Sequence, residues 1–555
     1  MYELATGTPA FSGSTAWQIW NAILTNSVTP ARGSYPSLPV GVQRVINKAL
    51  ASDRSLRYQS AVELSNDLHQ LKQGLQSGET FQGGSPVRRR PRISSIIDSL
   101  AVLPFENSSN DPENEYLSDG ITGTLINVLA SLPKLRVMAR STVFRFKGRD
   151  SDPKNVGREL DVRAVLAGRV MQRGDNLLIW AELIDVMTGA QLWGGQYNRK
   201  FGDIFEIQEE ISNEIVRQLQ PRLTRKEKKR LVRRQTNNAE AYQLYLKGRH
   251  HWNRWTKQGF DTGIEYFHRA IEKDPGYALA YVGLADSYVL LGWNSHVPPE
   301  EAFLASKAAA MKALQLDQEL AEAHTSLAAV LWLYDWHWQE AQTEFKRSIQ
   351  LAPAYPNVNH WFGEYLSTMG RCEEAITQIE HARERDPLSL IINAAGGWAS
   401  YCARHYDDAI KQLERTLELD PNYSVARWIL GLVYRTLGRY DAATAEGEKS
   451  VVLSGGSPLM RAALAQTYGM AGMRKEALEI LAALTSLATQ EYIAPYFFAE
   501  IHMGLLEKDR ALEWLEKAYE ENSHWLLYLH IDPSMDTLRG DPRFDNLLQR
   551  VGLPL

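Results

Sequence analysis

The chain has 555 residues, too many for one hydrophobic core, and the usual sizes of domains predict three or four of them. With 44% hydrophobic and 23% charged residues it has an ordinary globular composition, and a net charge of −5 excludes a general attraction to nucleic acid or anionic membranes. The sequence contains neither an apolar run long enough to span a bilayer nor a secretory signal, so we expect a cytoplasmic protein. Two cysteines, Cys372 and Cys402, cannot form a disulfide framework.

Residues 1–73 are predicted to be helical, with loops between the helices. The stretch "YELATG" ends like a helix, because Gly7 and Pro9 follow it, but no capping residue precedes it. Three short amphipathic helices are expected next, in "TAWQIWNAIL", "VGVQRVINKALA" and "AVELSNDLHQLK", the last one behind a capping box of Ser60 and Glu63. Residues 74–93 are rich in Gly, Ser, Gln and Arg with little to bury, which predicts a flexible basic linker.

Residues 94–221 are predicted to form a small α/β domain. "SLAVLPF" and "KLRVMARSTVF" are β-rich, and "GITGTLINVLASL" between them has helical periodicity, so a βαβ unit is expected. Hairpin turns are expected at "RGDN" and "MTGA", and the amphipathic helix "DIFEIQEEISNEIVRQLQ" ends the domain. Three carboxylates, Glu113, Glu115 and Asp119, crowd one loop; they fit a metal site or, more commonly, the N-terminus of a helix, which favours acids.

Residues 222–238 are predicted to be a basic linker helix. The stretch "RLTRKEKKRLVRR" has eight basic residues and one acid, but only Leu and Val recur, without the aromatic interleaving of a nucleic-acid site. We therefore expect a solvated helix, and nucleic-acid binding is the weaker alternative. The pair His250 and His251 lacks zinc-site spacing and is expected in packing or on the surface.

Residues 239–555 repeat themselves with a period of 34 residues, marked by Pro353, Pro387 and Pro421. Small residues recur where two helices would cross, and large apolar residues recur between neighbouring units; they are Gly363, Ala375, Gly397, Ala409, Gly431, Ala443, Phe345, Ile379 and Leu413. This pattern resembles the tetratricopeptide repeat family. The resemblance implies about eight stacked helix pairs, with "GDPRFDNLLQRVGL" as a capping helix. The expected fold is thus multidomain and mainly α, with the small α/β domain in front of the repeat solenoid.

The tetratricopeptide resemblance also implies a binding site. In that family the first helices of the repeats line a concave groove, whose positions here would include His360, Glu364, Trp398, Tyr401, Trp428 and Arg435. Exposed aromatic and Arg side chains anchor peptides, whereas the alternative for each residue is packing between repeats. The expected partner is a protein or peptide, with no nucleic acid and no membrane, and self-association stays open. The Lys/Asn pattern that clamps a C-terminal carboxylate is missing at these positions, which disfavours a chaperone-tail receptor.

The N-terminal region carries a second resemblance. "YELATGTPAFSGSTAWQIWNAIL" and "VINKALASDRSLRYQSAVELSNDL" resemble the end of the C-lobe of a bacterial serine/threonine protein kinase. The resemblance gives Arg57 a structural role, pairing with a glutamate that has no counterpart in this chain. Kinase catalysis needs a glycine-rich loop, a strand lysine, and H-R-D and D-F-G motifs, and the sequence contains none of them. We therefore expect no enzyme activity and no cofactor, and a loosely folded kinase remnant or a truncated reading frame at 1–73.

The middle region, over about residues 98–220, is similar to the α/β domain that precedes tetratricopeptide repeats in bacterial signalling proteins, a domain akin to the N-terminal domain of TolB. Because such domains are often fused to a kinase, a cyclase or a DNA-binding regulator, the resemblance implies a coupling or sensory module. The expected function is a scaffold that binds a peptide or protein in the repeat groove. The alternative is the regulatory fragment of a serine/threonine protein kinase whose ATP-binding and catalytic parts lie upstream.

Overall fold

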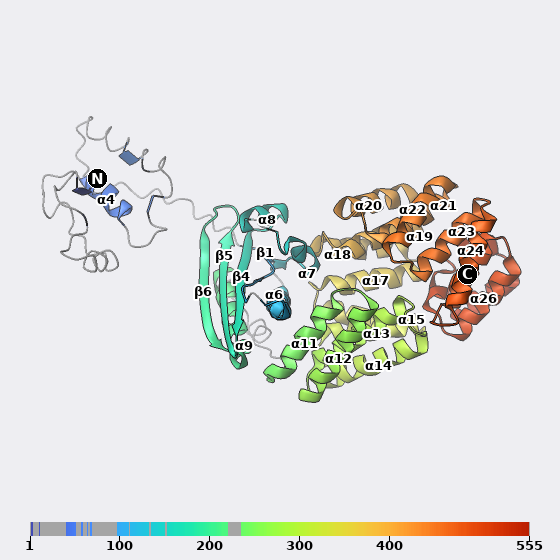
Figure 1. Cartoon of the computed structure of the whole chain (residues 1–555), viewed down its shortest axis with the longest axis horizontal. Helices are drawn as coiled ribbons and strands as arrows, with labels where there is room; N and C mark the ends of the chain where they lie inside the picture. The colour runs from blue at the N-terminus through green and yellow to red at the C-terminus, as the bar shows by residue number, and fades with distance from the viewer. Residues whose placement is uncertain are drawn as a thin grey trace. The chain divides into compact units, whose positions relative to one another are not determined.

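The computed structural model describes residues 2–3, 10, 40–50, 57–58, 64, 67–68, 97–109, 111–132, 135–149, 152–219 and 235–553. The chain forms two compact units, Met1–Ser95 and Ile96–Leu555 (Figure 1). The helix expected at 15–24, the linker at 74–93 and the basic stretch at 222–234 lie outside the described residues, as does most of the helix expected at 61–72.

The first unit contains α4 (Val40–Ala49), in the segment where a helix was expected. Its Ile46 is buried against Tyr2, and this small cluster is the core of the described part of the unit. The ammonium of Lys48 lies 4.4 Å from the centre of the Tyr58 ring. Arg57, to which the kinase resemblance gives a structural role, is exposed, and that role stays a prediction.

The second unit begins with a mixed sheet. Within residues 97–219 as described, its strands run in the order β3-β1-β4-β5-β6, and β2 pairs with β4. Strand β1 is parallel to β3 and β4, while β4, β5 and β6 are antiparallel, so the expected βαβ unit and two hairpins are confirmed. Gly174 and Gly189 take positive φ angles, 59° and 70°, in the two hairpin turns. The strands are β1 (Ser99–Val102), β2 (Glu106–Asn107), β3 (Arg136–Val137), β4 (Ala164–Arg173), β5 (Asn176–Asp185) and β6 (Gln191–Lys200).

Two helices, α6 (Glu115–Ala130) and α9 (Ile204–Leu219), cover the face of the sheet that is turned toward the repeats (Figure 1). Strand β5 shows why one face is covered, because every second side chain is buried, at Leu177, Ile179, Ala181 and Leu183. The amphipathic helix expected at the end of the domain is confirmed as α9. A short helix at one end of the sheet, α8 (Pro153–Glu159), was not expected.

The predicted β-rich run "KLRVMARSTVF" is wrong beyond its first residues. Only Arg136–Val137 is strand, and α7 (Arg140–Val143) follows, continued by the 3-10 turn η3 (Phe144–Phe146). The Thr142 hydroxyl donates to Asp386 Oδ1 at 2.7 Å and the Ser141 hydroxyl donates to the same carboxylate. Contacts to a residue far along the chain thus override the local β propensity, which was all that the sequence showed.

The rest of the second unit is the repeat array. Among described residues 239–520 there are eight helix pairs, each helix packed against the next, and α27 (Pro542–Val551) lies near the C-terminal end. The pairs are α11 (Ala239–Trp252) with α12 (Lys257–Lys273), α13 (Ala278–Trp293) with α14 (Pro299–Leu316), α15 (Ala321–Leu333) with α16 (Trp338–Leu351), α17 (Pro356–Thr368) with α18 (Cys372–Arg385), α19 (Leu390–Cys402) with α20 (Tyr406–Leu419), α21 (Ser424–Thr436) with α22 (Tyr440–Leu453), α23 (Pro458–Met470) with α24 (Arg474–Leu487), and α25 (Pro495–Gly504) with α26 (Lys508–Glu520).

The small residues of the period lie where the helices cross. A Cβ added to Gly397 would lie 2.6 Å from the Leu413 side chain, and one added to Gly363 would lie 2.6 Å from Ile379. Leu413 and Ile379 are themselves buried. The close approach explains why the sequence alternates small and large apolar residues at these positions.

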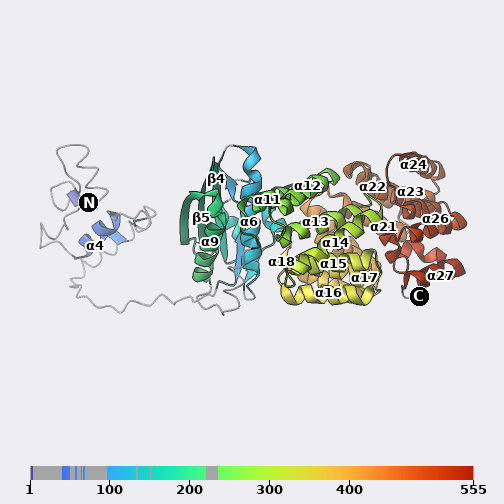
Figure 2. The same ribbon diagram turned by 90° about the horizontal axis from the view of Figure 1, so that it is seen from below.

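The chain's C-terminal segment, residues 523–540, packs across the array instead of continuing it. It contains the 3-10 turns η5 (His524–Tyr528) and η6 (Pro533–Leu538). The Trp525 indole donates to the Ser295 hydroxyl at 3.1 Å, and Arg404 makes two hydrogen bonds of 2.8 Å to Asp536. The segment thereby joins the last repeat to the second and fifth repeats. Figure 2 shows α26 and α27, which flank this segment in the sequence, at the end of the array away from the sheet.

The α/β domain and the first repeat share one hydrophobic core. Ala241, Leu244 and Leu246 of α11 belong to the same buried cluster as the sheet residues. The Tyr242 hydroxyl accepts from Gln208 of α9 at 2.7 Å and lies 2.8 Å from the Thr124 hydroxyl of α6. The domain also contacts the array at Asp386, through α7, and at Leu419, whose carbonyl accepts from Arg145 at 2.6 Å. A space is left between these contacts and the shared core at α11.

Candidate functional site

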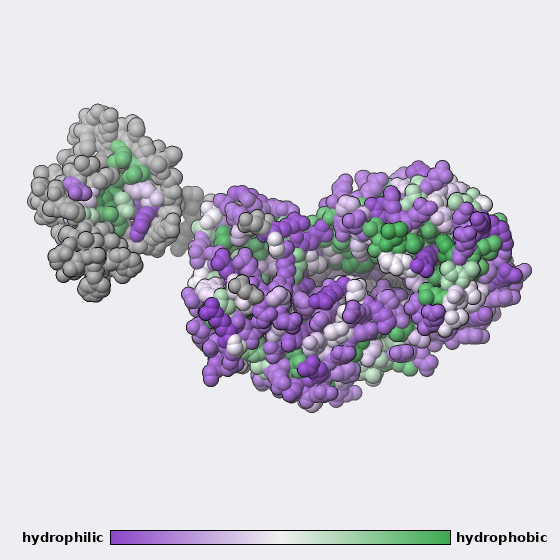
Figure 3. All heavy atoms as spheres, viewed as in Figure 1, coloured by the Kyte–Doolittle hydropathy of each residue, from purple (hydrophilic) through white to green (hydrophobic). Residues whose placement is uncertain are grey.

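A cavity of about 1490 Å³ lies between the α/β domain and the first helices of the repeats. Its wall is built by α6, α7 and α9 on one side, by α11, α13, α15, α17, α19, α21 and α23 on the other, and by η5. Figure 3 shows this face of the molecule hollowed between the sheet domain and the repeats. The cavity is larger than the roughly 300–1,000 Å³ of sites for drug-sized ligands, so it has room for a peptide segment.

One part of the cavity is an aromatic wall, which we define as Trp293, Trp361, Trp398, Trp428 and Trp525. Trp398 and Trp428 stack with their ring centres 5.9 Å apart at 17°. Trp293 and Trp361 meet edge to face at 5.3 Å. All five line the cavity, and such rigid rings are the side chains on which apolar anchors of peptides pack.

A polar pair on α17 interrupts this apolar surface. His360 Nε2 lies 3.9 Å from Glu364 Oε1, one helical turn away, and both side chains are buried. Burial lowers the pKa of His360 to about 4 and raises the pKa of Glu364 to about 8. At neutral pH the contact therefore joins an uncharged imidazole and a protonated carboxyl group. The pair is polar but carries no net charge.

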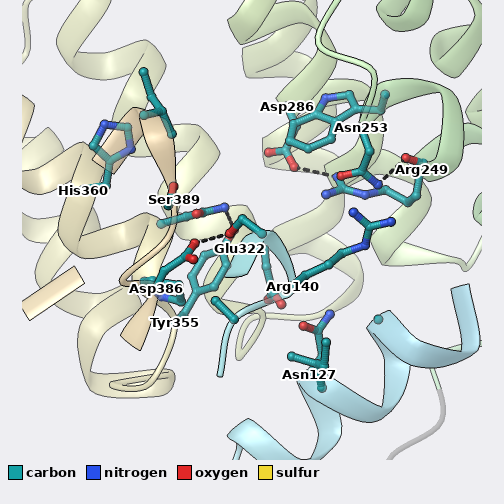
Figure 4. A pocket seen from close by; sticks show the side chains of 18 of the residues that line it. Asn127, Arg140, Arg249, Asn253, Asp286, Glu322, Tyr355, His360, Asp386 and Ser389 are labelled. Carbon is teal, nitrogen blue, oxygen red and sulfur yellow. Dashed lines mark hydrogen bonds and ion pairs between the residues drawn. The ribbon is translucent and has the colours of Figure 1, made fainter. Parts of the chain in front are cut away.

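A second polar group lies where α11, α13 and α15 meet the cavity (Figure 4). Arg249 Nη1 lies 3.1 Å from Asp286 Oδ2, and the Ser326 hydroxyl donates to Asp286 Oδ1 at 2.8 Å. Burial raises the pKa of Asp286, although Arg249 and Ser326 oppose the shift. Burial also raises the pKa of Glu322, which lines the same corner.

Asp119 of α6 connects the α/β domain to the first repeat. Its carboxylate contacts the Lys147 ammonium, lies 3.8 Å from Arg140 Nη2 and lies 3.3 Å from His250 Nδ1 of α11. Burial alone would raise the pKa of Asp119, but hydrogen bonds from His250 and Lys147 and the charge of Arg140 bring it below its ordinary value. The carboxylate therefore stays ionised inside the junction.

The other residues of the predicted acidic loop have separate roles. Glu115 is the first residue of α6 and lies 2.5 Å from Lys147 Nζ, while Glu113 is exposed in the preceding turn. Glu115 is thus at a helix N-terminus, where its charge is favoured. In the part of the chain that the structure describes, no group of three His, Cys, Asp or Glu side chains is arranged to hold a metal ion. His251 stacks on Tyr266 at 5.5 Å, which is a packing role.

Four of the expected groove residues line the cavity, namely His360, Glu364, Trp398 and Trp428. Tyr401 and Arg435 do not belong to its lining. Tyr401 donates to Asp532 Oδ1 at 3.0 Å and Arg435 donates to the Ala463 carbonyl at 3.2 Å, and both are buried. The C-terminal segment reaches Tyr401 through Asp532, so the chain itself supplies a partner there. The signal in the sequence was the run "HWLLYLHIDPSM", which has no helical period and too many large apolar residues for a solvated tail.

The sequence did not predict that four further charged residues line the cavity, namely Arg140, Arg249, Asp286 and Glu322. For Asp286 a signal existed, because it is a lone carboxylate in the otherwise apolar helix "GLADSYVLLGW", and a buried charge needs a partner. For Arg140 no signal existed, because its position depends on the docking of α7 against the array.

Comparisons with known proteins match separate parts of the chain. A family model described as the HilA/YgeH-like transcriptional regulator, second domain, matches residues 96–220, and a tetratricopeptide repeat model matches residues 395–458. Putative adenylate cyclase 3 of Rhizobium meliloti (strain 1021) is 36% identical over 236 residues, 42% of this chain and 40% of that protein. Transcriptional regulator HilA of Salmonella typhimurium is 23% identical over 174 residues, 31% of each protein. The chain thus covers less than half the length of these relatives.

Serine/threonine-protein kinase PknB of Mycobacterium leprae is 26% identical over 199 residues, 34% of this chain and 32% of that protein. Among solved structures, YrrB, "a TPR protein with an unusual peptide-binding site", is 20% identical, covers 34% of this chain and 93% of its own, and has a TM-score of 0.25. The APC/C hetero-tetramer Cut9-Hcn1 is 13% identical over 63% of this chain and 54% of its own, with a TM-score of 0.34. TM-scores this low support no argument about function.

The chain therefore carries tetratricopeptide repeats in its C-terminal part, behind a middle domain similar to the second domain of HilA. The expected likeness to TolB stays a prediction. The similarity to PknB is weak and extends over more residues than 1–73, so the kinase remnant also stays a prediction. Across the described residues, no helix combines the length and the apolar character needed to cross a bilayer.

Proposed function

We propose that this chain is the protein-binding part of a bacterial signalling protein, and that a peptide or protein segment binds in the cavity between the α/β domain and the repeats. The observation that carries the proposal is the aromatic wall that lines the cavity between the α/β domain and the repeats. A segment that packs on Trp398 and Trp428 would contact the array, and a segment that reaches α7 would contact the domain as well. Binding would in this way couple the two domains, as the middle domain's similarity to a regulator's second domain supports.

The test uses the whole chain, because α11 shares its core with the sheet and the array has not been shown to fold alone. The partner is captured from cell lysate, purified, and its affinity measured by calorimetry for the unchanged chain and for Trp428→Ala. We expect a loss of about thirtyfold, since central aromatic anchors contribute 2 kcal/mol or more. The matched control is Trp514→Ala, which removes an indole stacked on Phe498 at 4.5 Å outside the cavity lining. Equal affinities of both variants for the partner would contradict the proposal.

A second candidate, the regulatory part of a serine/threonine protein kinase, is supported by the similarity to PknB. In that case the glycine-rich loop, H-R-D and D-F-G motifs would be encoded upstream of this chain in the same gene. Sequencing the transcript across the Met1 codon tests this directly. A transcript that starts there would oppose it, and transfer of radiolabelled phosphate by the purified chain itself would contradict both candidates.

A further inference from the structure

Arg140 of α7 has hydrogen-bonding capacity that the described residues leave unused. It lines the cavity, and its guanidinium makes no hydrogen bond to any described residue; its nearest carboxylate, Asp119, lies 3.8 Å away. The guanidinium carbon lies 3.6 Å from the centre of the Phe144 ring. A ring that covers the flat face holds the guanidinium in place and leaves the N–H groups at its edge free to donate.

A second cation lies nearby on the first repeat. Arg249 uses Nη1 for Asp286, and its guanidinium carbon lies 4.1 Å from the centre of the Trp252 ring. Figure 4 shows the Arg140 guanidinium pointing toward Arg249 across the cavity. Burial lowers the pKa of Arg140 to about 10, and the charge of Arg249 adds to that effect, although Asp119 opposes it. Two like charges held in one cavity favour the entry of an anion between them.

The carboxylates around the two arginines do not replace such an anion. Asp119 is shared with Lys147 and His250, both of which approach it more closely than Arg140 does. Asp286 already accepts hydrogen bonds from Arg249 and from the Ser326 hydroxyl, and burial raises the pKa values of Asp286 and Glu322. The edge of Arg140 is therefore open to a carboxylate that comes from outside the chain.

One helix, α13, carries both Asp286, the partner of Arg249, and the first residue of the aromatic wall. Asp286 and Trp293 lie on the same helix, α13, seven residues apart, and both line the cavity. A rise of 1.5 Å per residue separates them by about 10 Å. In a peptide in the polyproline II conformation, which rises about 3.1 Å per residue with three residues per turn, side chains three residues apart lie on the same face and about 9 Å apart. One peptide can thus place a carboxylate on the arginines and an apolar ring on the wall.

We propose that the cavity recognises an acidic side chain between Arg140 and Arg249, together with an aromatic side chain three residues further along a peptide in the polyproline II conformation. The proposal rests on the proposed function and specifies the chemistry of the partner segment. The size of the cavity favours a peptide over a small free anion, because a small anion would leave the aromatic wall without a contact.

The experiment measures binding of fluorescein-labelled, C-terminally amidated peptides to the whole chain by fluorescence anisotropy. The probe is Gly-Glu-Ala-Ala-Phe-Gly, and the matched peptides are Gly-Gln-Ala-Ala-Phe-Gly and Gly-Ala-Ala-Glu-Phe-Gly. We expect the first peptide to bind at least about tenfold more tightly than the other two, since a charge-assisted hydrogen bond contributes that much. The variant Arg140→Gln should remove this preference for Glu over Gln, and Arg140→Lys should restore part of it.

The control variant is Arg371→Gln, whose arginine pairs with Glu374 on the surface and does not line the cavity. It should bind the three peptides as the unchanged chain does, and thermal unfolding of all variants verifies that they are folded. Equal binding of the Glu and Gln peptides, no binding of any peptide, or a preference that survives Arg140→Gln would each overturn the proposal. If the captured partner loses affinity with Trp428→Ala but not with Arg140→Gln, the proposed function holds and the acidic site is wrong.

Discussion

At the junction of the α/β domain with the first repeat, the Asp119 carboxylate lies among three basic side chains, Lys147, Arg140 and His250. In the middle of the array, the Glu364 carboxylate has only His360 within ion-pairing distance among the described residues. Both carboxylates are buried, 7% and 6% exposed, yet the pKa of Asp119 is lowered and that of Glu364 is raised to about 8. Burial is therefore not what separates them. The difference is whether other elements bring fixed cations to the carboxylate.

The two carboxylates also differ in the parts of the chain that they connect. The partners of Asp119 are Arg140 on α7, Lys147 directly after η3 and His250 on α11, so its charge holds together parts of the chain that are distant in sequence. Glu364 and His360 are on one helix, and among the described residues their ion-pair contact is with each other. The junction thus depends on charge, and the aromatic wall depends on apolar packing with a neutral polar pair in it.

Glu364→Gln should have the largest effect, and it should appear as a change in pH dependence. The folded protein keeps a proton on Glu364 up to about pH 8, whereas the unfolded chain releases it near the ordinary pKa of 4.5. Stability from this group is complete below pH 4.5 and decreases as pH rises toward 8. The variant has no such loss, so its free energy of unfolding relative to the unchanged chain should rise by roughly 3–5 kcal/mol over that range.

Urea unfolding at several pH values measures this difference. Glu500, whose pKa burial also raises to about 8, is present in both proteins and cancels in the comparison. Glu513→Gln, at an exposed position of α26, is the matched control. Parallel stability curves for Glu364→Gln and the unchanged chain would show that Glu364 is ionised in the folded protein.

Asp119→Asn should have the next largest effect, and it should lower the free energy of unfolding. It removes the negative charge shared by Arg140, Lys147 and His250, while Lys147 keeps Glu115. Removing one partner of a buried ion pair costs roughly 3–5 kcal/mol, and here we expect roughly 2–3 kcal/mol, because the Arg140 and Lys147 side chains are about a third exposed. The exposed pair of Glu106 and Arg169 provides the control, since Glu106→Gln should change stability by less than about 1 kcal/mol.

The Asp119 effect should also depend on pH in a defined way. Its folded pKa lies below the ordinary 3.8, so the stability that it contributes is present above pH 3.8 and is lost as pH falls through the lowered value. The difference between Asp119→Asn and the unchanged chain in urea unfolding should therefore be constant from neutral pH down to about 4. A difference that disappears between pH 5 and 7 would contradict an ionised Asp119.

The sequence predicted the parts of this molecule that depend on local pattern. The 34-residue period predicted the helix pairs, because each repeat packs only against its neighbours. The resemblance to tetratricopeptide repeats then implied that His360, Glu364, Trp398 and Trp428 lie on first helices, and these four line the cavity. It could not predict the burial of Tyr401 under Asp532, or the cation cluster around Asp119. Both join residues more than a hundred positions apart, and no period or local propensity reports such contacts.

Asp386→Asn should have the smallest effect on stability. The surroundings of Asp386 are intermediate between those of Asp119 and Glu364. Its carboxylate is 2% exposed and has two hydroxyl donors, Ser141 and Thr142, in place of cations. Burial raises its pKa while the two hydroxyl groups oppose the shift. Asparagine can accept one of the two hydrogen bonds, so we expect a loss of about 1 kcal/mol, concentrated where α7 docks. Hydrogen exchange of the Leu388 amide, which donates to the Thr142 hydroxyl at 3.0 Å, measures this loss of local stability.

The control is Asp420→Asn, the same position one repeat later, where the carboxylate accepts from the Asn422 amide of its own turn and not from the α/β domain. If both variants exchange the Leu388 amide at the same rate, the hydroxyl contacts do not hold the domain against the array.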